Sequence, residues 1–194
     1  MLVKILKKVP DEVFYPVVDE ITNINWDEVV DRDRSKRSVF STSRSIHLRT
    51  HKVLKGQPIP TTISEWSSIV DCVNKEEHVL KYPNTYNLAK WAYTQVGGIR
   101  LGRIMIINLL PEGKVDPHID PGEYFEVHSR FHVPVITNEN VVFLSGPDSE
   151  LEHMPVGMLS RLNNRATHSV ENRSKEYRVH VLIDIATPGG NVIF

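Results

Sequence analysis

The stretch YRVHVLIDI, residues 177–185, belongs to the pattern that decides the fold of this chain. It is short, rich in β-branched residues and largely apolar, and similar runs precede it throughout the second half of the sequence. Turn-forming residues such as Pro-Glu-Gly, Asn-Glu-Asn and Asn-Asn separate the runs. The predicted strands are Ile99–Leu110, Phe125–Ile136, Val141–Leu144, Gly157–Leu162, Ala166–Glu171 and Tyr177–Ile185. Many short strands in succession favour a sandwich, barrel or jelly roll.

The first half of the chain has a different pattern. Residues Thr61–Tyr93 predict two helices, because apolar side chains recur at helical spacing and a break falls near Tyr82-Pro83-Asn84. The apolar positions of the first helix are Ile63, Trp66, Val70 and Val73, with Thr61 or Thr62 as the N-terminal cap. An upstream run, Ser45–Val53, is expected to be extended.

These patterns predict an α+β fold with a mainly β core. The length of 194 residues fits one domain. We expect residues 1–97 to form a helical and extended elaboration and residues 98–194 to form the core that carries the site.

Composition excludes several classes of protein. A formal net charge of −1 gives no overall positive potential that would attract nucleic acid, and a single cysteine excludes a disulfide framework. There is no apolar run long enough to span a membrane, so a cytoplasmic protein is expected. The stretch Arg32–Lys55 holds eight cations and one anion. A nucleic-acid patch is one interpretation of it, but a solvated basic face is the better one and a nucleic-acid partner is not expected.

His118-Ile119-Asp120 is the first candidate for chemistry. In an extended segment, residues i and i+2 point to the same face, so the imidazole of His118 and the carboxylate of Asp120 would converge. A histidine and a carboxylate are two of the three ligands in the 2-His-1-carboxylate triad of non-haem Fe(II) oxygenases. An exposed turn between flanking prolines is the alternative interpretation. His168 is the best-placed third ligand, although a lone histidine on a strand is more often structural.

Two arginines add to this candidate site. Arg178 lies ten residues after His168 in a run apolar enough to be buried, and a buried arginine needs an anion. It could hold a dicarboxylate in a bidentate fork, or it could face outward and pair with Glu176 or Asp184. In the strand around residues 128–135, alternation places Arg130 and His132 on one face, opposite Phe131, Val133 and Val135. Beside a metal site these two basic groups would form an anion-binding wall, whereas on a strand that faced water they would be plain surface residues.

Taken together, these residues resemble the aspartyl/asparaginyl β-hydroxylase family of Fe(II)- and 2-oxoglutarate-dependent oxygenases. The resemblance covers roughly residues 99–187, with a weaker match upstream at Ser45–Arg49. Asp120 is present where the animal peptidyl hydroxylases lack a carboxylate, so the bacterial and phage-type branch is the better match. The matching text is LLPEGKVDPHID (109–120), Arg130-Phe-His132, NNRATHSVENR (163–173) and RVHVLID (178–184).

The resemblance implies a double-stranded β-helix, a cupin-like jelly roll, with N-terminal helices packed on it. It implies iron ligands at His118, Asp120 and His168, with the far carboxylate of 2-oxoglutarate held by Arg178. Arg130 and His132 match additional cosubstrate-binding positions, whereas Ile107 replaces a serine that the family uses.

The function implied by the resemblance is hydroxylation by dioxygen of a C–H bond in an amino acid, Asp/Asn-like or proline-like, with release of succinate and CO2. The substrate would be a small molecule or a peptide. The alternative from another class is a cupin-like metal- or ligand-binding module that does not turn over 2-oxoglutarate.

Overall fold

Alternation along the last strand, β11 (Arg178–Ala186), sorts the interior of the protein into two environments. Val179, Val181, Ile183 and Ile185 point to one face and join the main hydrophobic core. Arg178, His180, Leu182 and Asp184 occupy the alternate positions on the other face. The same division holds in β6 (His128–Ile136), because Phe131, Val133 and Val135 join that core while Arg130 and His132 do not. This confirms the predicted facing of β6.

The computed structural model describes residues 2–29, 38–145 and 150–191. Within these ranges, eleven strands form two sheets in which every pairing is antiparallel. The larger sheet has the order β1-β9-β6-β11-β4-β2-β3, and the smaller has the order β5-β10-β7-β8. The remaining strands are β1 (Val3–Lys8), β2 (Ser43–His51), β3 (Cys72–Asn74), β4 (Arg100–Leu109), β5 (Lys114–His118), β7 (Val141–Ser145), β8 (Glu150–Glu152), β9 (Met158–Leu162) and β10 (His168–Asn172).

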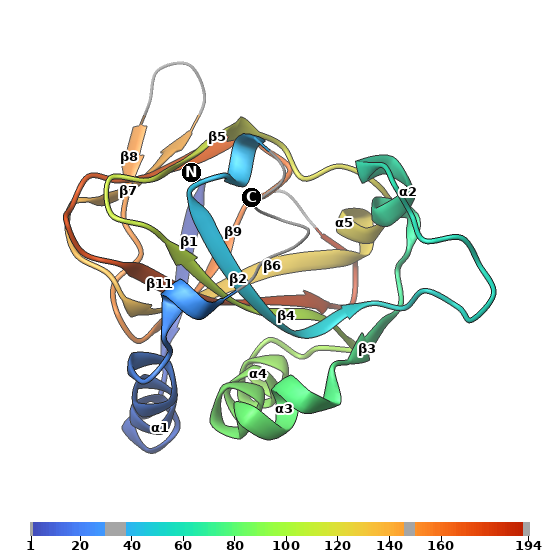
Figure 1. The fold of residues 1–194 in the computed structure, drawn as a ribbon, viewed down its shortest axis with the longest axis horizontal. Helices are drawn as coiled ribbons and strands as arrows, with labels where there is room; N and C mark the ends of the chain where they lie inside the picture. Colours follow the sequence, from blue (N-terminus) through green and yellow to red (C-terminus); the bar gives the residue numbers. More distant parts are fainter. Residues whose placement is uncertain (1, 30–37, 146–149, 192–194) are drawn as a thin grey trace.

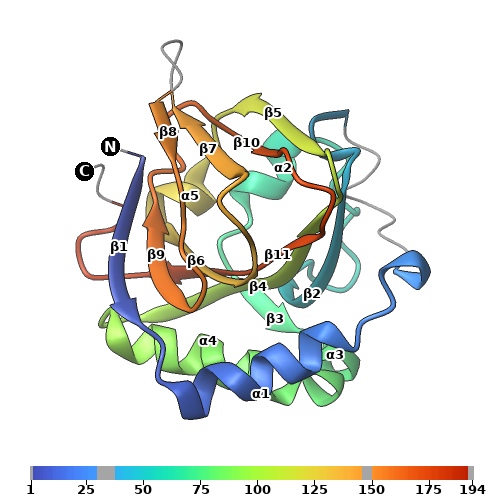
Figure 2. The same ribbon diagram turned by 90° about the vertical axis from the view of Figure 1, so that its left-hand side faces the viewer.

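The layers are visible in Figures 1 and 2, where helices cover one face of the larger sheet and the smaller sheet lies over the other. The covering helices are α1 (Asp11–Thr22), α3 (Glu76–Lys81) and α4 (Pro83–Gln95). Val17 and Ile21 of α1 and Leu88 of α4 are fully buried in one cluster with the outer face of the larger sheet, against which Val79 of α3 packs partly buried. A second, smaller cluster containing Leu109, Phe143 and Leu162 lies between the two sheets. The predicted α+β jelly roll with helices packed on it is confirmed.

One predicted helix is wrong in part. Helix α2 (Ile63–Ser68) begins as expected, with Thr62 and Glu65 forming a capping box, but it ends at Ser68. Val70 and Val73 are not helical, and Cys72–Asn74 forms the edge strand β3, which pairs with β2. The β-branched run Ile69-Val70 and the free edge of β2 outweigh the helical spacing. The predicted break at Pro83 is confirmed, since α4 begins there.

A second correction concerns Phe125. The predicted strand Phe125–Ile136 begins only at His128, because Glu123–Val127 forms the short helix α5. Its start depends on Gly122, whose φ of 93° is accessible to glycine at little cost.

The first half of the chain does more than cover the core. It supplies three of the seven strands of the larger sheet, with β1 pairing with β9 and β2 pairing with β4. None of the described helices is long and apolar enough to cross a membrane.

In the basic stretch, Arg32, Arg34, Lys36 and Arg37 lie outside the described residues. Arg49 is not available to bind a nucleic-acid phosphate, because its guanidinium donates to Asn74 and to the backbone oxygens of Cys72, Leu101 and Gly102.

Candidate active site

Two adjoining spaces lie on the inner face of the larger sheet, one lined by both sheets and the other by the larger sheet, α2 and α5. The first, here called the histidine cavity, has a volume of about 40 Å³ and is lined by His118, His132, His168 and Arg178. The second, the Arg103 pocket, has a volume of about 150 Å³ and is lined by Arg103, Asp120 and several aromatic side chains. Arg130 and Phe40 line both spaces and therefore form the wall between them.

His118 and His168 are brought together by strand pairing. They are directly opposite one another on β5 and β10, and their ring centroids lie 4.3 Å apart. Each Nδ1 lies within hydrogen-bond distance of a carbonyl oxygen two residues earlier, Asp116 for His118 (2.8 Å) and Ala166 for His168 (2.9 Å). Because a carbonyl oxygen only accepts, each Nδ1 must carry the proton, which leaves the Nε2 lone pair available to a metal.

Burial also favours the neutral, ligand form of His168, since it lowers the pKa of the imidazole against the opposing effect of Asp120.

Asp120 lies just beyond the end of β5 rather than on it, and its carboxylate is tied to neighbouring side chains. Its Oδ2 accepts from Arg130 Nη1 at 2.7 Å and from Asn164 Nδ2 at 3.2 Å. Burial would raise the pKa of Asp120, but Arg130 and the nearby imidazoles hold it below the ordinary value, so the group is ionised. In the described part of the chain, no three His, Cys, Asp or Glu side chains are grouped as a metal site as they stand. Oδ1 is the oxygen that Asp120 can offer to a metal without losing these contacts.

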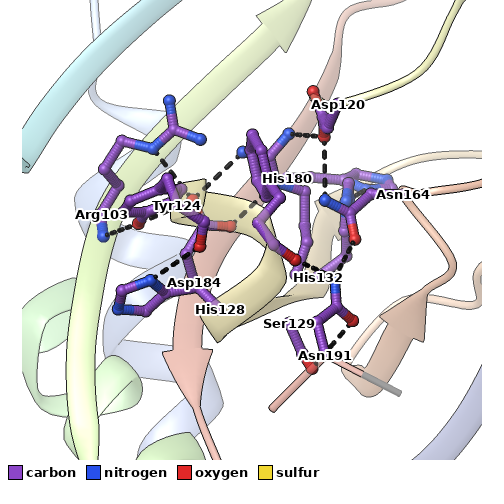
Figure 3. A network of polar contacts seen from close by, with 12 residues as sticks. Arg103, Asp120, Tyr124, His128, Ser129, His132, Asn164, His180, Asp184 and Asn191 are labelled. Carbon is purple, nitrogen blue, oxygen red and sulfur yellow. Dashed lines mark hydrogen bonds and ion pairs between the residues drawn. The ribbon is translucent and has the colours of Figure 1, made fainter. Parts of the chain in front are cut away.

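A buried ion network stands behind Asp120 (Figure 3). Asp184, which is fully buried, accepts two hydrogen bonds from Arg130, at 2.9 and 3.1 Å, and a third from Arg103 Nε at 3.0 Å. The Tyr124 hydroxyl donates to the same carboxylate at 3.2 Å. Burial opposes ionisation of Asp184, but Arg130 and Arg103 outweigh it and hold its pKa well below the usual range. The network fixes both guanidinium groups.

Arg178 is buried on the inner face of β11, so the alternative in which it faces outward and pairs with Glu176 or Asp184 is wrong. Its guanidinium packs over the ring of Phe143, and Nη2 donates to His180 Nδ1 at 2.7 Å. His180 Nδ1 also lies 3.3 Å from His132 Nδ1, which must therefore donate to it.

The Nε2 atoms of His132 and His180 indicate whether a ligand is expected nearby. Nε2 of His132 and Nε2 of His180 are buried and have no hydrogen-bond partner among the described residues. Burial, together with the charge of Arg178, lowers the pKa of both imidazoles well below the ordinary value, so both are neutral. A buried polar atom without a partner is rare in proteins, and because His132 lines the histidine cavity, its Nε2 favours a polar ligand there.

The structure thus brings the predicted residues together in two groups. His118, His132, His168 and Arg178 line the histidine cavity, Asp120 lines the Arg103 pocket, and Arg130 lines both. Residue-level reasoning missed Arg103, Tyr124, Asn164 and the central position of Asp184. Alternation could have found Asp184, which lies six residues after Arg178 and thus on the same face of β11. Asn164 lies in a turn and carries no such signal.

The sequence matches the family described as aspartyl/asparaginyl beta-hydroxylase over residues 25–188. No curated protein sequence matches the chain.

Several solved structures share the fold. One is a prolyl hydroxylase from Trichoplax adhaerens in complex with a peptide fragment of hypoxia inducible factor, with 9% identity and a TM-score of 0.58 over 97% of this chain and 85% of that one. AviO1 from Streptomyces viridochromogenes Tue57 has 13% identity and a TM-score of 0.54 over 100% of this chain and 93% of that one.

A 2OG-Fe(II) oxygenase family oxidoreductase from Burkholderia pseudomallei has 9% identity and a TM-score of 0.50 over 74% of this chain and 66% of that one. At such identities the likeness shows the fold alone. The family match spans most of the sequence, so the chain belongs to the aspartyl/asparaginyl beta-hydroxylase family and to the class of 2-oxoglutarate-dependent dioxygenases.

Proposed function

We propose that this protein hydroxylates a C–H bond of an amino acid, free or within a peptide, using Fe(II), dioxygen and 2-oxoglutarate. His118, His168 and Asp120 Oδ1 would hold the iron, and Arg178 would hold the far carboxylate of 2-oxoglutarate. The observation that carries the proposal is the pair of imidazoles with both Nε2 lone pairs free, in the same cavity as a buried arginine.

The residues present fit these groups chemically. Two imidazoles and one carboxylate are a donor set that suits Fe(II), and a guanidinium matches the geometry of a carboxylate. The unpartnered Nε2 of His132 lines the same cavity as Arg178, which supports a polar cosubstrate there. When bound, Fe(II) and 2-oxoglutarate supply the oxidation by dioxygen that inserts one oxygen atom into the substrate C–H bond, with succinate and CO2 as the other products.

The protein's own residues do the positioning. Arg130 ties Asp120 to the sheet through Asp184, and only three of its five N–H groups are used in these contacts. The others are free to reach a cosubstrate carboxylate, as the family resemblance implies. The apolar side chains around the histidine cavity, Leu109, Phe143 and Leu182 among them, exclude water from the reacting groups.

The test begins with anaerobic addition of Fe(II) and 2-oxoglutarate to the purified protein, which we expect to give a visible metal-to-ligand charge-transfer band. His118→Ala and His168→Ala should abolish the band, because each removes a ligand. His153→Ala is the matched control, since its Nδ1 also contacts a backbone oxygen, that of Val141, but its ring lines neither space. Unchanged iron binding in both His118→Ala and His168→Ala would overturn the site.

Arg178→Ala separates an oxygenase from a plain metal-binding module. An oxygenase should retain iron but lose 2-oxoglutarate affinity by about 30-fold or more, as truncating one partner of a buried charge pair does. Equal 2-oxoglutarate affinity in wild type and Arg178→Ala would instead favour the module without turnover.

A further inference from the structure

The Arg103 pocket is separate from the histidine cavity and has its own cation. Arg103 comes from the inner face of β4, four residues before Ile107 on the same face, and Met105 between them lines the pocket beside it. Arg178 lines only the histidine cavity, and Arg103 lines only the Arg103 pocket. The two arginines therefore serve different spaces.

Arg103 is held rigidly, and part of its hydrogen-bonding capacity is unused. Its guanidinium carbon lies 4.6 Å from the ring centroid of Tyr124 and 5.0 Å from that of Phe125, and its Nε donates to Asp184. Nη2 is buried and has no hydrogen-bond partner in the described part of the chain. The side chain is 17% exposed and lines the Arg103 pocket, whereas Asp184 behind it is fully buried.

The charges around the pocket leave room for one anion when Asp120 holds the iron of the proposed function. Arg103 and Arg130 carry two positive charges there, and Asp184 and Asp120 carry two negative ones. If Asp120 binds a divalent cation, its charge is offset by the ion, and the other three groups sum to one positive charge. His51, which also lines the pocket, adds none at neutral pH, because burial and the charge of Arg103 lower its pKa to about 4.

We propose that the Arg103 pocket binds the substrate of this enzyme and that Arg103 receives a carboxylate of that substrate. The substrate is then a small carboxylate-bearing molecule or residue whose remaining atoms pack against Phe40, Trp66, Met105 and Phe125. The inference rests on the proposed function for the position of the reacting carbon, since Arg130 and Phe40 separate the pocket from the histidine cavity and Asp120, a proposed iron ligand, lines the pocket.

The carboxylate could be the α-carboxylate of a free amino acid or the side chain of a peptidyl aspartate. Two matched pairs of probes distinguish these sources: L-proline against L-prolinamide, and N-acetyl-aspartate amide against N-acetyl-asparagine amide. Binding is measured by chemical-shift titration of the full-length protein, with no need for turnover. We expect the acid of at least one pair to bind about 30-fold or more tightly than its amide. Equal binding of acid and amide in both pairs, or no binding by either acid, would overturn the proposal.

Variants then assign the contact. Arg103→Gln should remove the preference for the acid, and Arg103→Lys should restore part of it because the charge is retained. Arg100→Gln is the matched control, since Arg100 lies on the same strand but is exposed and pairs with exposed Asp71. An unchanged preference for the acid in Arg103→Gln would contradict the role of Arg103.

The visible band with Fe(II) and 2-oxoglutarate keeps the two proposals distinguishable. If wild type shows the acid preference without the band, the iron site fails and the anion pocket stands; if it shows the band without the preference, only the substrate assignment fails.

Discussion

Asp184 is the residue on which the arrangement of charged groups depends. Its carboxylate is completely buried, yet it is ionised because two guanidinium groups donate to it. It holds Arg130, which in turn positions Asp120, and it holds Arg103, the cation of the pocket. A buried ion pair of this kind adds little net stability compared with an apolar core, but removing one partner leaves uncompensated charge.

Asp184→Asn is therefore expected to lower the free energy of unfolding by about 3–5 kcal/mol, measured by urea denaturation at pH 7. Asp71→Asn is the control, because its partner Arg100 is at the surface and such pairs contribute about 0–1 kcal/mol. Similar losses in the two variants would contradict the importance assigned to the buried carboxylate.

The same carboxylate predicts a dependence of stability on pH. The pKa of Asp184 is lower in the folded state than the ordinary value of 3.8, so its contribution is fully present above about pH 4 and is lost as the pH falls further. Wild type should lose stability more steeply than Asp184→Asn between pH 4 and pH 2. Parallel curves of unfolding free energy against pH would show that Asp184 is not the titrating group.

At the scale of elements, the contact between α2 and α5 builds one side of the Arg103 pocket. Trp66 and Ser67 come from α2, and Tyr124 and Phe125 come from α5. The two helices approach closely at Gly122, where a Cβ atom would lie 2.4 Å from Ser67 Cβ. Gly122 thus has two reasons to be glycine, its positive φ and this contact.

Gly122→Ala separates these two reasons when it is compared with Gly56→Ala. Gly56 has a similar φ of 88° but no heavy atom within 4 Å of the added Cβ, so it carries only the backbone cost of about 1–3 kcal/mol. Gly122→Ala should cost about 1–3 kcal/mol more, since the alanine methyl must displace α2. Urea denaturation of both variants measures the difference. Equal losses of unfolding free energy would mean that α2 and α5 move apart at no measurable cost.

At the scale of the whole molecule, the sequence predicts what depends on alternation and misses what depends on strand order. Period-two spacing was sufficient to place Arg130 and His132 opposite Phe131. It could not show that Asp184 meets Arg130, because that contact requires β11 to be the neighbour of β6. Strand β1 was missed for a related reason: only one of its six residues is buried, and its partner β9 lies about 150 residues away.

The integration of the two halves leads to a last prediction, that residues 98–194 do not fold alone. Without β2 and β1, the strands β4 and β9 would have unpaired edges, and without α1 and α4 the apolar face containing Ile104, Phe131 and Ile183 would be exposed to water. We expect this fragment to lack a near-ultraviolet circular dichroism signal and a cooperative urea transition, both of which the full chain should show. A cooperative transition in the fragment would mean that the smaller sheet and β4, β6, β9 and β11 suffice as a core, with the first half added to a finished fold.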